Sequence, residues 1–244
     1  MSICEDLRFL LLQARLPGDV VREEERAAFA QQLAVDLEQV IPLDIFETSP
    51  TASHRDDVNA ILVGGSGDYG VVNPIEPIQA MIRFVADTAQ SGFPMFASCF
   101  GFQAMVVGLG GSVIEDHKHT EVGTCEVRRL ATADGDPLFN TLPEHFTAQM
   151  GHKDRADRLP EGVVNMVESE RCPYQAIKIE GTPVYATQFH PELSGDDNRR
   201  RFKRYRKEYG TLFGEEEAQA LLEGCRPSPQ ANALLSRFVD EFLA

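Results

Sequence analysis

The chain has 244 residues, of which 43% are hydrophobic and 25% are charged, and this composition is that of a folded globular protein rather than of a disordered or fibrous one. Its formal net charge of −15 predicts an acidic surface, which argues against nucleic acid and anionic membranes as partners. No apolar run has the length that a membrane-spanning helix needs.

The first half of the chain alternates between strand-like and helix-like segments. Short apolar runs predict strands at Leu7–Gln13, Val40–Phe46, Val58–Val63 and Pro94–Ser98. Apolar residues at helical spacing predict helices at Val20–Glu38, Ile75–Gln90 and Gly101–Leu109. Alternation of this kind predicts an α/β fold, with an open, mainly parallel twisted sheet and helices on both faces.

The second half is richer in short strands. Strand-like runs separated by turn residues occur at Gly111–Ile114, Gly123–Leu130, His145–Met150, Val163–Glu168, Tyr174–Ile179 and Val184–Phe189. We expect some of them to extend the sheet and others to pair antiparallel. The last fifty residues return to helical patterns, so we predict one domain over residues 1–244, with residues 195–244 as its helical C-terminal extension.

One stretch of this extension is strongly basic. Residues 199–207, RRRFKRYRK, carry seven basic side chains in nine positions. Such a run is usually the solvated face of a helix. The alternative is a docking patch for an acidic partner, and both interpretations stay open.

The cysteines bear on the compartment and on metal binding. They number five, an odd count, and no C-x-x-C motif occurs among Cys4, Cys99, Cys125, Cys172 and Cys225. This pattern argues against a disulfide framework and against a zinc site. The first six residues lack a basic stretch and a cleavage signal, so we expect no signal peptide and a cytoplasmic protein without a bound metal.

Cys99 stands at a corner between a predicted strand and a predicted helix, in the sequence PMFASCFGFQ. A strand that ends in a nucleophile and turns at once into a helix exposes that side chain at the carboxyl edge of the sheet. The helix N-terminus favours the thiolate, and the backbone N–H of Phe100 is free for a developing oxyanion. Gly101 lets the tight turn close. Core filling is the competing role for a cysteine in this position.

A thiol nucleophile also needs a base and an acid that orients the base. His190 follows a predicted strand in the sequence TQFHPE, and Pro191 ends that strand. Residues two apart in an extended segment can face one site, so Glu192 can hold the imidazole of His190 in one tautomer. Cys99, His190 and Glu192 therefore form a candidate triad, separated in sequence and joined in space.

These motifs carry a family resemblance. The pair CFGFQ and QFHPE resembles the class I, or triad, glutamine amidotransferases, over about Leu7 to Glu192. The segments HTEVGTCEV, MGHKDRADRLPEG and CPYQAIKIEGTPVYATQFHPE are similar to the glutaminase part of GMP synthetases in particular. The resemblance implies a flavodoxin-like sheet of the kind described above.

The resemblance also implies roles for individual residues. Cys99 would be the nucleophile, His190 the base and Glu192 its orienting acid. The segment ILVGGSGDYG resembles the family's oxyanion loop, so that the N–H groups of Gly65 and Phe100 would hold the oxyanion. The remaining matches concern substrate binding: Gln103, Lys153 and Asp154.

The implied reaction is hydrolysis of the glutamine side-chain amide through a γ-glutamyl thioester, with no metal or organic cofactor. It releases ammonia for a separate acceptor enzyme. No GxxxxGK[S/T] loop occurs in the chain, so we expect a separate synthetase subunit to activate the acceptor. A homo-oligomer is compatible with the sequence.

Two other interpretations stay open. The same residues would serve a free-standing γ-glutamyl peptidase, hydrolase or transferase that acts on another γ-glutamyl amide. A protein of this fold could also bind or regulate a partner without catalysis, but the presence of all three residues of the candidate triad favours an enzyme.

Overall fold

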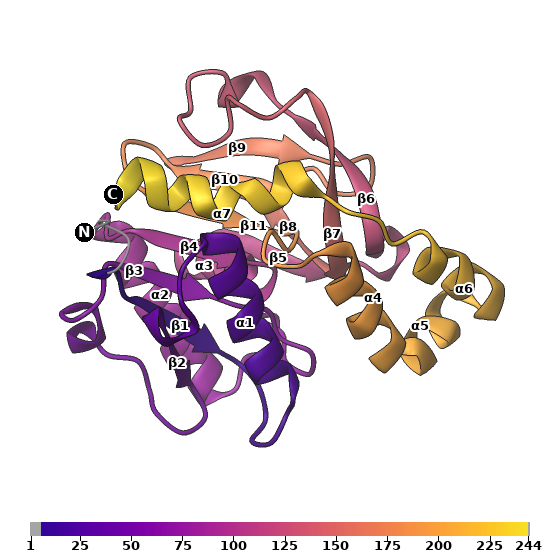
Figure 1. The fold of residues 1–244 in the computed structure, drawn as a ribbon, viewed down its shortest axis with the longest axis horizontal. Helices are drawn as coiled ribbons and strands as arrows, with labels where there is room; N and C mark the ends of the chain where they lie inside the picture. Colours follow the sequence, from indigo (N-terminus) through magenta and orange to yellow (C-terminus); the bar gives the residue numbers. More distant parts are fainter. Residues whose placement is uncertain (1–5, 244) are drawn as a thin grey trace.

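The computed structural model of the chain describes residues 6–243, in which a nine-stranded sheet runs between two layers of helices (Figure 1). The strand order is β2-β1-β3-β4-β11-β10-β9-β6-β7, and a separate two-stranded sheet pairs β5 with β8. The strands are β1 (Phe9–Gln13), β2 (Val40–Asp44), β3 (Ala60–Val63), β4 (Met95–Ser98), β5 (Ser112–Glu115), β6 (Glu121–Arg129), β7 (His145–His152), β8 (Asp154–Arg158), β9 (Val163–Glu168), β10 (Ala176–Ile179) and β11 (Val184–Thr187).

The prediction of a mainly parallel sheet with antiparallel strands in the second half is confirmed. From β2 to β11 the five neighbouring strands are parallel, and from β11 to β7 the pairs are antiparallel. All five residues of β1 and all four of β3 and β4 are buried, because both faces of the parallel part are covered by helices.

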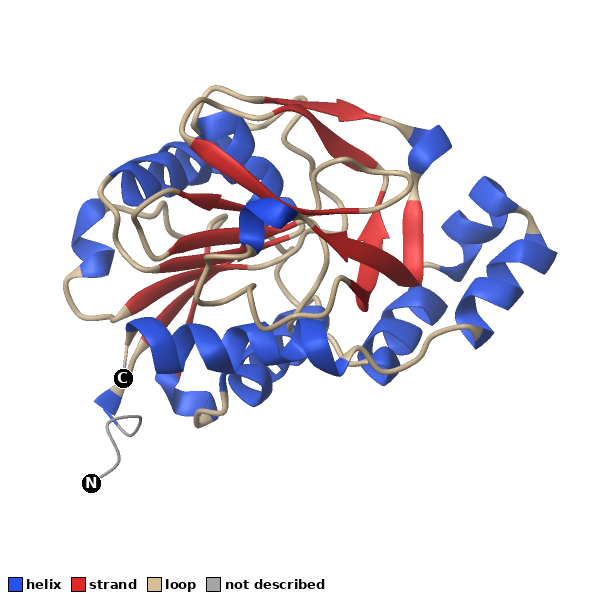
Figure 2. Ribbon diagram, turned by 90° about the horizontal axis from the view of Figure 1, so that it is seen from above, coloured by secondary structure: helices blue, strands red, loops and turns tan. Residues whose placement is uncertain are grey.

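Helices α1 (Val21–Leu33) and α7 (Pro229–Phe242) pack side by side on one face of the sheet, and α2 (Glu76–Gln90) and α3 (Phe100–Gly108) cover the other. Figure 2 shows helices on both sides of the strands. Alternate residues of β1 enter the two cores, because successive side chains of a strand point to opposite faces: Phe9 and Leu11 join α1 and α7, whereas Leu10 and Leu12 join α2 and α3.

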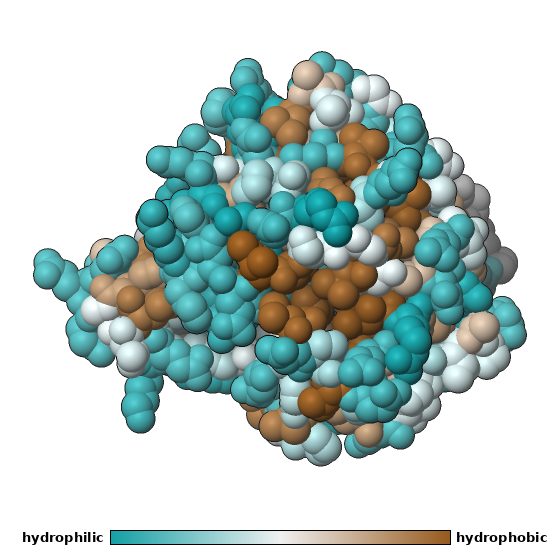
Figure 3. Space-filling view, turned by 180° about the vertical axis from the view of Figure 1, so that it is seen from behind, coloured by the Kyte–Doolittle hydropathy of each residue, from teal (hydrophilic) through white to brown (hydrophobic). Residues whose placement is uncertain are grey.

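On the α2 and α3 side, part of the apolar layer reaches the surface. Hydrophobic side chains gather near the middle of the face seen in Figure 3. The core on this side includes side chains that are only half-buried, among them Leu109, Val113 and Ile179.

Three helices at one end of the molecule separate the sheet from α7 in the sequence: α4 (Gly195–Arg204), α5 (Arg206–Phe213) and α6 (Glu215–Glu223) (Figure 1). They pack on β6 through a small cluster of Val122, Phe202, Ala218 and Leu222. The predicted C-terminal helices are therefore present. The prediction of one domain over residues 1–244 stays a prediction.

The basic stretch 199–207 lies across α4 and α5, and most of its charges are paired within the chain. Five arginines of this stretch form ion pairs with Asp or Glu side chains: Arg199, Arg200, Arg201, Arg204 and Arg206. The larger part of the positive charge is thus neutralised locally, which weakens the interpretation as a docking patch.

Strand β8 was not expected from the sequence, because its residues DRADR have the polar composition of a loop. It pairs antiparallel with β5 outside the main sheet. Among residues 6–243 no helix is long and apolar enough to cross a membrane. Cys99, Cys125, Cys172 and Cys225 are free thiols, and Cys4 lies outside the described residues.

Candidate active site

Cys99 occupies a strained turn between β4 and α3. Its φ of 51° and ψ of −101° lie where a residue with a side chain is rarely found. Its N–H donates to the Thr187 carbonyl at the end of β11, at 2.7 Å. The turn also requires Gly101, because a Cβ there would lie 2.7 Å from the Cβ of Val63 on the neighbouring strand β3. The sequence prediction of a sharp strand-to-helix corner at Cys99 agrees with this geometry.

His190 and Glu192 follow β11, the parallel neighbour of β4, so both segments end at the same edge of the sheet. Nδ1 of His190 lies 2.6 Å from Oε1 of Glu192, and both side chains are buried. Burial disfavours the charged imidazole, but the carboxylate of Glu192 and the sulfur of Cys99 outweigh it and raise the pKa of His190 to about 10. The three predicted residues are therefore brought together, and the imidazole favours its protonated form.

Two glycines border the imidazole of His190. A Cβ on Gly65 would lie 3.0 Å from Cε1 of His190, and a Cβ on Gly151 would lie 3.8 Å from Nε2. The ring therefore sits between the loop after β3 and strand β7. A side chain at position 65 would press directly on it.

The two predicted oxyanion donors differ in their surroundings. Phe100 is the first residue of α3, where the backbone N–H has no partner within the helix. The N–H of Gly65 instead donates to Oε1 of Glu25, at 3.0 Å. The assignment of Gly65 as an oxyanion donor stays a prediction, and in this structure its N–H points at a buried carboxylate.

Glu25 was not singled out by the sequence, in which it is one of three consecutive glutamates at the start of a predicted helix. In the structure it is fully buried. Its oxygens accept hydrogen bonds from Gln13 at 2.9 Å and from Arg15 at 3.2 Å, in addition to the one from Gly65. Only the tertiary structure distinguishes this carboxylate from its two neighbours on α1.

A pocket of about 710 Å³ opens at Cys99. Its lining includes the loop 66–70, the end of β7 with the start of β8, and Tyr205, Glu208 and Tyr209 from the C-terminal helices. Gln103 also lines it, although its Nε2 donates to the Asp154 carbonyl at 2.9 Å. The pocket is large enough for a substrate that extends beyond the reacting amide.

Asp154 lines this pocket, and one oxygen of its carboxylate is unpaired. Its side chain is almost fully buried, Oδ1 has no hydrogen-bond partner, and burial raises the pKa of the group. Lys153 beside it is exposed. A buried carboxylate without a partner can receive an ammonium group of a ligand. The substrate-binding roles of Gln103, Lys153 and Asp154 stay predictions.

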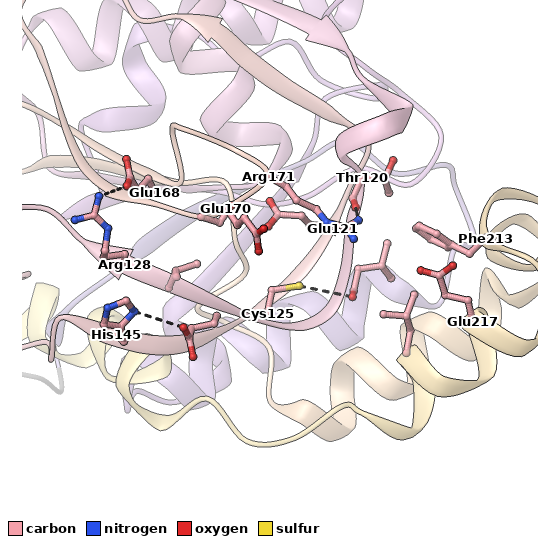
Figure 4. A pocket seen from close by; sticks show the side chains of 15 residues that line it. Thr120, Glu121, Cys125, Arg128, His145, Glu168, Glu170, Arg171, Phe213 and Glu217 are labelled. Carbon is pink, nitrogen blue, oxygen red and sulfur yellow. Dashed lines mark hydrogen bonds and ion pairs between the residues drawn. The ribbon is translucent and has the colours of Figure 1, made fainter.

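A second pocket of about 440 Å³ lies beside β6, away from Cys99, and Figure 4 shows its lining. Arg128 pairs there with Glu168, and His145 with Glu126. Cys125 also lies in it, but burial raises the pKa of its thiol to about 12, so this sulfur stays protonated. Among residues 6–243 no group of three or more His, Cys, Asp or Glu side chains could hold a metal ion.

Comparison with known proteins places most of the chain in one family. The model of the family described as glutamine amidotransferase class-I matches residues 30–205, a span that includes positions 99, 190 and 192. GMP synthase [glutamine-hydrolyzing] of Thermosipho melanesiensis is 31% identical over 176 residues, which are 72% of this chain and 30% of that protein. The protein of the same name from Thermosipho africanus is 37% identical over 112 residues, 46% of this chain and 21% of its own length. The chain thus spans less than a third of these relatives.

Solved structures share the fold at lower identity. A glutamine amidotransferase from Thermotoga maritima aligns with a TM-score of 0.72 and 18% identity, covering 97% of this chain and 99% of that one. A protein from Thermoplasma acidophilum, described as a putative GMP synthase subunit, aligns with a TM-score of 0.61 and 22% identity, covering 88% and 98%. At these identities the alignments show the fold alone.

Proposed function

The chain belongs to the class-I glutamine amidotransferase family, and on this premise we propose that it hydrolyses the side-chain amide of glutamine with Cys99 as the nucleophile. One observation carries the proposal. The His190–Glu192 pair, at 2.6 Å, is buried beside the strained Cys99 turn, at the edge of the sheet where a pocket opens. A base oriented by a carboxylate next to a thiol is the arrangement that nucleophilic catalysis requires.

The proposed reaction has two halves. The thiolate of Cys99 attacks the amide carbon, and the C=O electrons move onto oxygen to give a tetrahedral oxyanion. The oxyanion collapses, the C–N bond breaks, and the imidazolium of His190 gives its proton to the departing ammonia. Water, deprotonated by the same imidazole, then attacks the γ-glutamyl thioester and releases glutamate and the thiolate. One oxyanion donor such as the N–H of Phe100 typically lowers the barrier by about 3–4 kcal/mol.

The ammonia would pass to a separate synthetase subunit. Two relatives that the chain resembles are named glutamine-hydrolysing GMP synthases, and one of the solved structures is described as that of a putative GMP synthase subunit. The chain matches less than a third of the length of those synthases, and we propose that a separate subunit activates the acceptor. The support for this step is the names of these relatives.

A free-standing γ-glutamyl hydrolase is the second candidate, and the pocket favours it. The cavity extends from Cys99 to Glu208 and Tyr209 on α5, beyond what a simple amide leaving group needs. A cavity of this extent would suit a γ-glutamyl amide with a larger amine portion. A binding or regulatory role without catalysis is favoured by no feature of the site.

Ammonia and glutamate release by the purified chain tests the proposal. Wild type should release both from glutamine or from a γ-glutamyl dipeptide, and Cys99→Ala should release neither. Cys125→Ala is the matched control, because this cysteine lies in the other pocket, and it should keep full activity. Activity in Cys99→Ala equal to wild type would remove the assignment.

The choice of substrate separates the two candidates. Weak release from glutamine that a synthetase subunit stimulates would support an amidotransferase subunit. A kcat/KM for γ-glutamyl dipeptides well above that for glutamine, without any partner, would support the hydrolase.

A further inference from the structure

We propose that Glu25 and Arg201 are positioning residues of this active site. Glu25 holds the Gly64–Gly65 loop against His190, and Arg201 links the Glu25 carboxylate to Glu192, so that α4 sets the charge around the imidazole. The inference rests on the proposed function for its catalytic meaning. The contacts themselves involve no substrate.

The Gly64–Gly65 loop is built directly on the Glu25 carboxylate. A Cβ on Gly64 would lie 2.6 Å from Cδ of Glu25, so a side chain there would displace the Glu25 carboxylate. The next N–H, that of Gly65, donates to Oε1 at 3.0 Å. A Cβ built on Gly65 would have three close neighbours: Cε1 of His190 at 3.0 Å, Nη2 of Arg15 at 3.6 Å and Oε1 of Glu25 at 3.8 Å. The glycine therefore stands between the imidazole and a buried ion pair.

Arg201 brings a cation to both buried carboxylates. Nη2 lies 3.9 Å from Oε1 of Glu25, and Nη1 lies 4.0 Å from Oε1 of Glu192. Its side chain is 12% exposed, and Nη2 has no hydrogen-bond partner. Burial works against the charged form of Glu192, but His190 and then Arg201 lower its pKa below the ordinary value. Arg201 thus acts on the orienting acid of the candidate triad.

Two further contacts hold α4 in this position. Both Nη atoms of Arg204 lie 3.2 Å from the carboxylate oxygens of Glu24, on the exposed side of the same pair of helices. The hydroxyl of Tyr205, the residue after α4, lies so close to Gly67 that a Cβ on Gly67 would clash with it. Two adjacent residues of α1 are therefore paired with α4: Glu24 with Arg204 at the surface, and Glu25 with Arg201 in the interior. The basic stretch 199–207, whose role the sequence did not decide, thus contributes the charge of Arg201 to the candidate active site.

The interpretation of residues 199–207 as a solvated helix face does not explain why the Arg201 side chain is mostly buried beside two carboxylates. Burying a carboxylate costs solvation that an ion pair returns only in part. Apolar side chains of similar volume are often equally stable in such a place, so stability alone does not require this ion pair. The network instead lies between the predicted oxyanion loop and the predicted orienting acid. Titratable and charged groups surround the His190 and Cys99 pair on several elements: Glu192 after β11, Glu25 on α1, Arg15 after β1, Arg201 on α4, Glu208 and Tyr209 on α5, and His152, Lys153 and Asp154 at β7 and β8.

Removing the charge of Arg201 and removing that of Glu25 should shift the pH dependence of Cys99 alkylation in opposite directions. Removing a positive charge near His190 makes proton loss from the Cys99 and His190 pair harder, and removing a negative charge makes it easier. In Arg201→Met the pH dependence of Cys99 alkylation should move up by about one pH unit, and in Glu25→Gln it should move down. Arg201→Lys keeps the charge and should restore the wild-type profile.

Iodoacetamide alkylation of Cys99, followed by mass spectrometry of its peptide from pH 5 to 10, measures these profiles on the full chain. Arg200→Met is the matched control, because Arg200 is exposed and pairs with Asp197, and its profile should equal wild type. Circular dichroism verifies that each variant is folded. If Arg201→Met does not fold, Arg201→Gln and the near-isosteric Glu25→Gln provide the test.

Opposite shifts of the two profiles with rescue by Arg201→Lys would support the proposal. Profiles that coincide with wild type, or that shift in the same direction in folded Arg201→Met and Glu25→Gln, would overturn it. Alkylation does not need glutamine hydrolysis, so a chain without glutaminase activity refutes the proposed function and leaves this measurement valid. A steady-state assay on active protein adds a second readout, in which kcat should fall in Glu25→Gln while KM stays near wild type, because the residue acts through the loop.

Discussion

Replacing Gly101 with alanine should damage both the stability of the protein and the reactivity of Cys99. The added Cβ would lie 2.7 Å from Cβ and 2.8 Å from the carbonyl oxygen of Val63, whereas ordinary contacts begin near 3.4 Å. The start of α3 must therefore move away from β3 by about 0.7 Å. Overpacking of this kind costs about 1–3 kcal/mol, and the better helix propensity of alanine returns up to about 1 kcal/mol. We expect a net destabilisation of about 1–2 kcal/mol.

The same displacement reaches Cys99, two residues before Gly101. A misplacement near 1 Å can cost about a hundredfold in rate, so we expect Cys99 alkylation and any glutaminase activity to fall about tenfold or more. Urea denaturation gives the stability, and Gly135→Ala is the control, because a Cβ at that loop glycine meets nothing within 4 Å. If Gly101→Ala unfolds at the same urea concentration as Gly135→Ala and keeps wild-type reactivity, the steric argument for the turn is wrong.

The remaining predictions concern the core and the titration of the site. Phe238 is fully buried against the rings of Phe96 and Tyr185, so Phe238→Ala should lower the free energy of unfolding by about 3–5 kcal/mol in urea, and a loss below about 1 kcal/mol would contradict the packing seen here. Asp136 accepts hydrogen bonds from the Tyr185 hydroxyl at 2.9 Å and from Lys178 at 2.7 Å, so Asp136→Ala should cost about 3 kcal/mol. The same urea titration checks this value, and a neutral effect would show that the buried carboxylate is dispensable. The raised pKa of His190 contributes stability that is complete below its ordinary value of 6.5 and is lost as the pH rises toward about 10. The difference in unfolding free energy between wild type and His190→Asn should therefore shrink over that range, and a difference that does not change with pH would refute the pairing.

Much of the fold was accessible from the sequence because local patterns and burial agree along most of the chain. Apolar runs of five to seven residues predicted strands at the right places, since a strand covered on both faces by helices must be apolar throughout. The polar strand β8 was missed for the converse reason. It pairs outside the main sheet and carries charged side chains, so no hydrophobic periodicity marks it.

The sequence alone determined the alternation of strands and helices, the corner that holds Cys99, and the nearness of His190 and Glu192 along the chain. These features depend on residues within a few positions of one another, where propensity and steric limits act directly. The tertiary structure alone decided that β4 and β11 are parallel neighbours, that Glu25 rather than Glu23 or Glu24 receives the Gly65 N–H, and that Arg201 joins that carboxylate to Glu192. Such choices depend on which faces of distant helices meet, and a run of three glutamates or three arginines gives no local signal that singles out one of them.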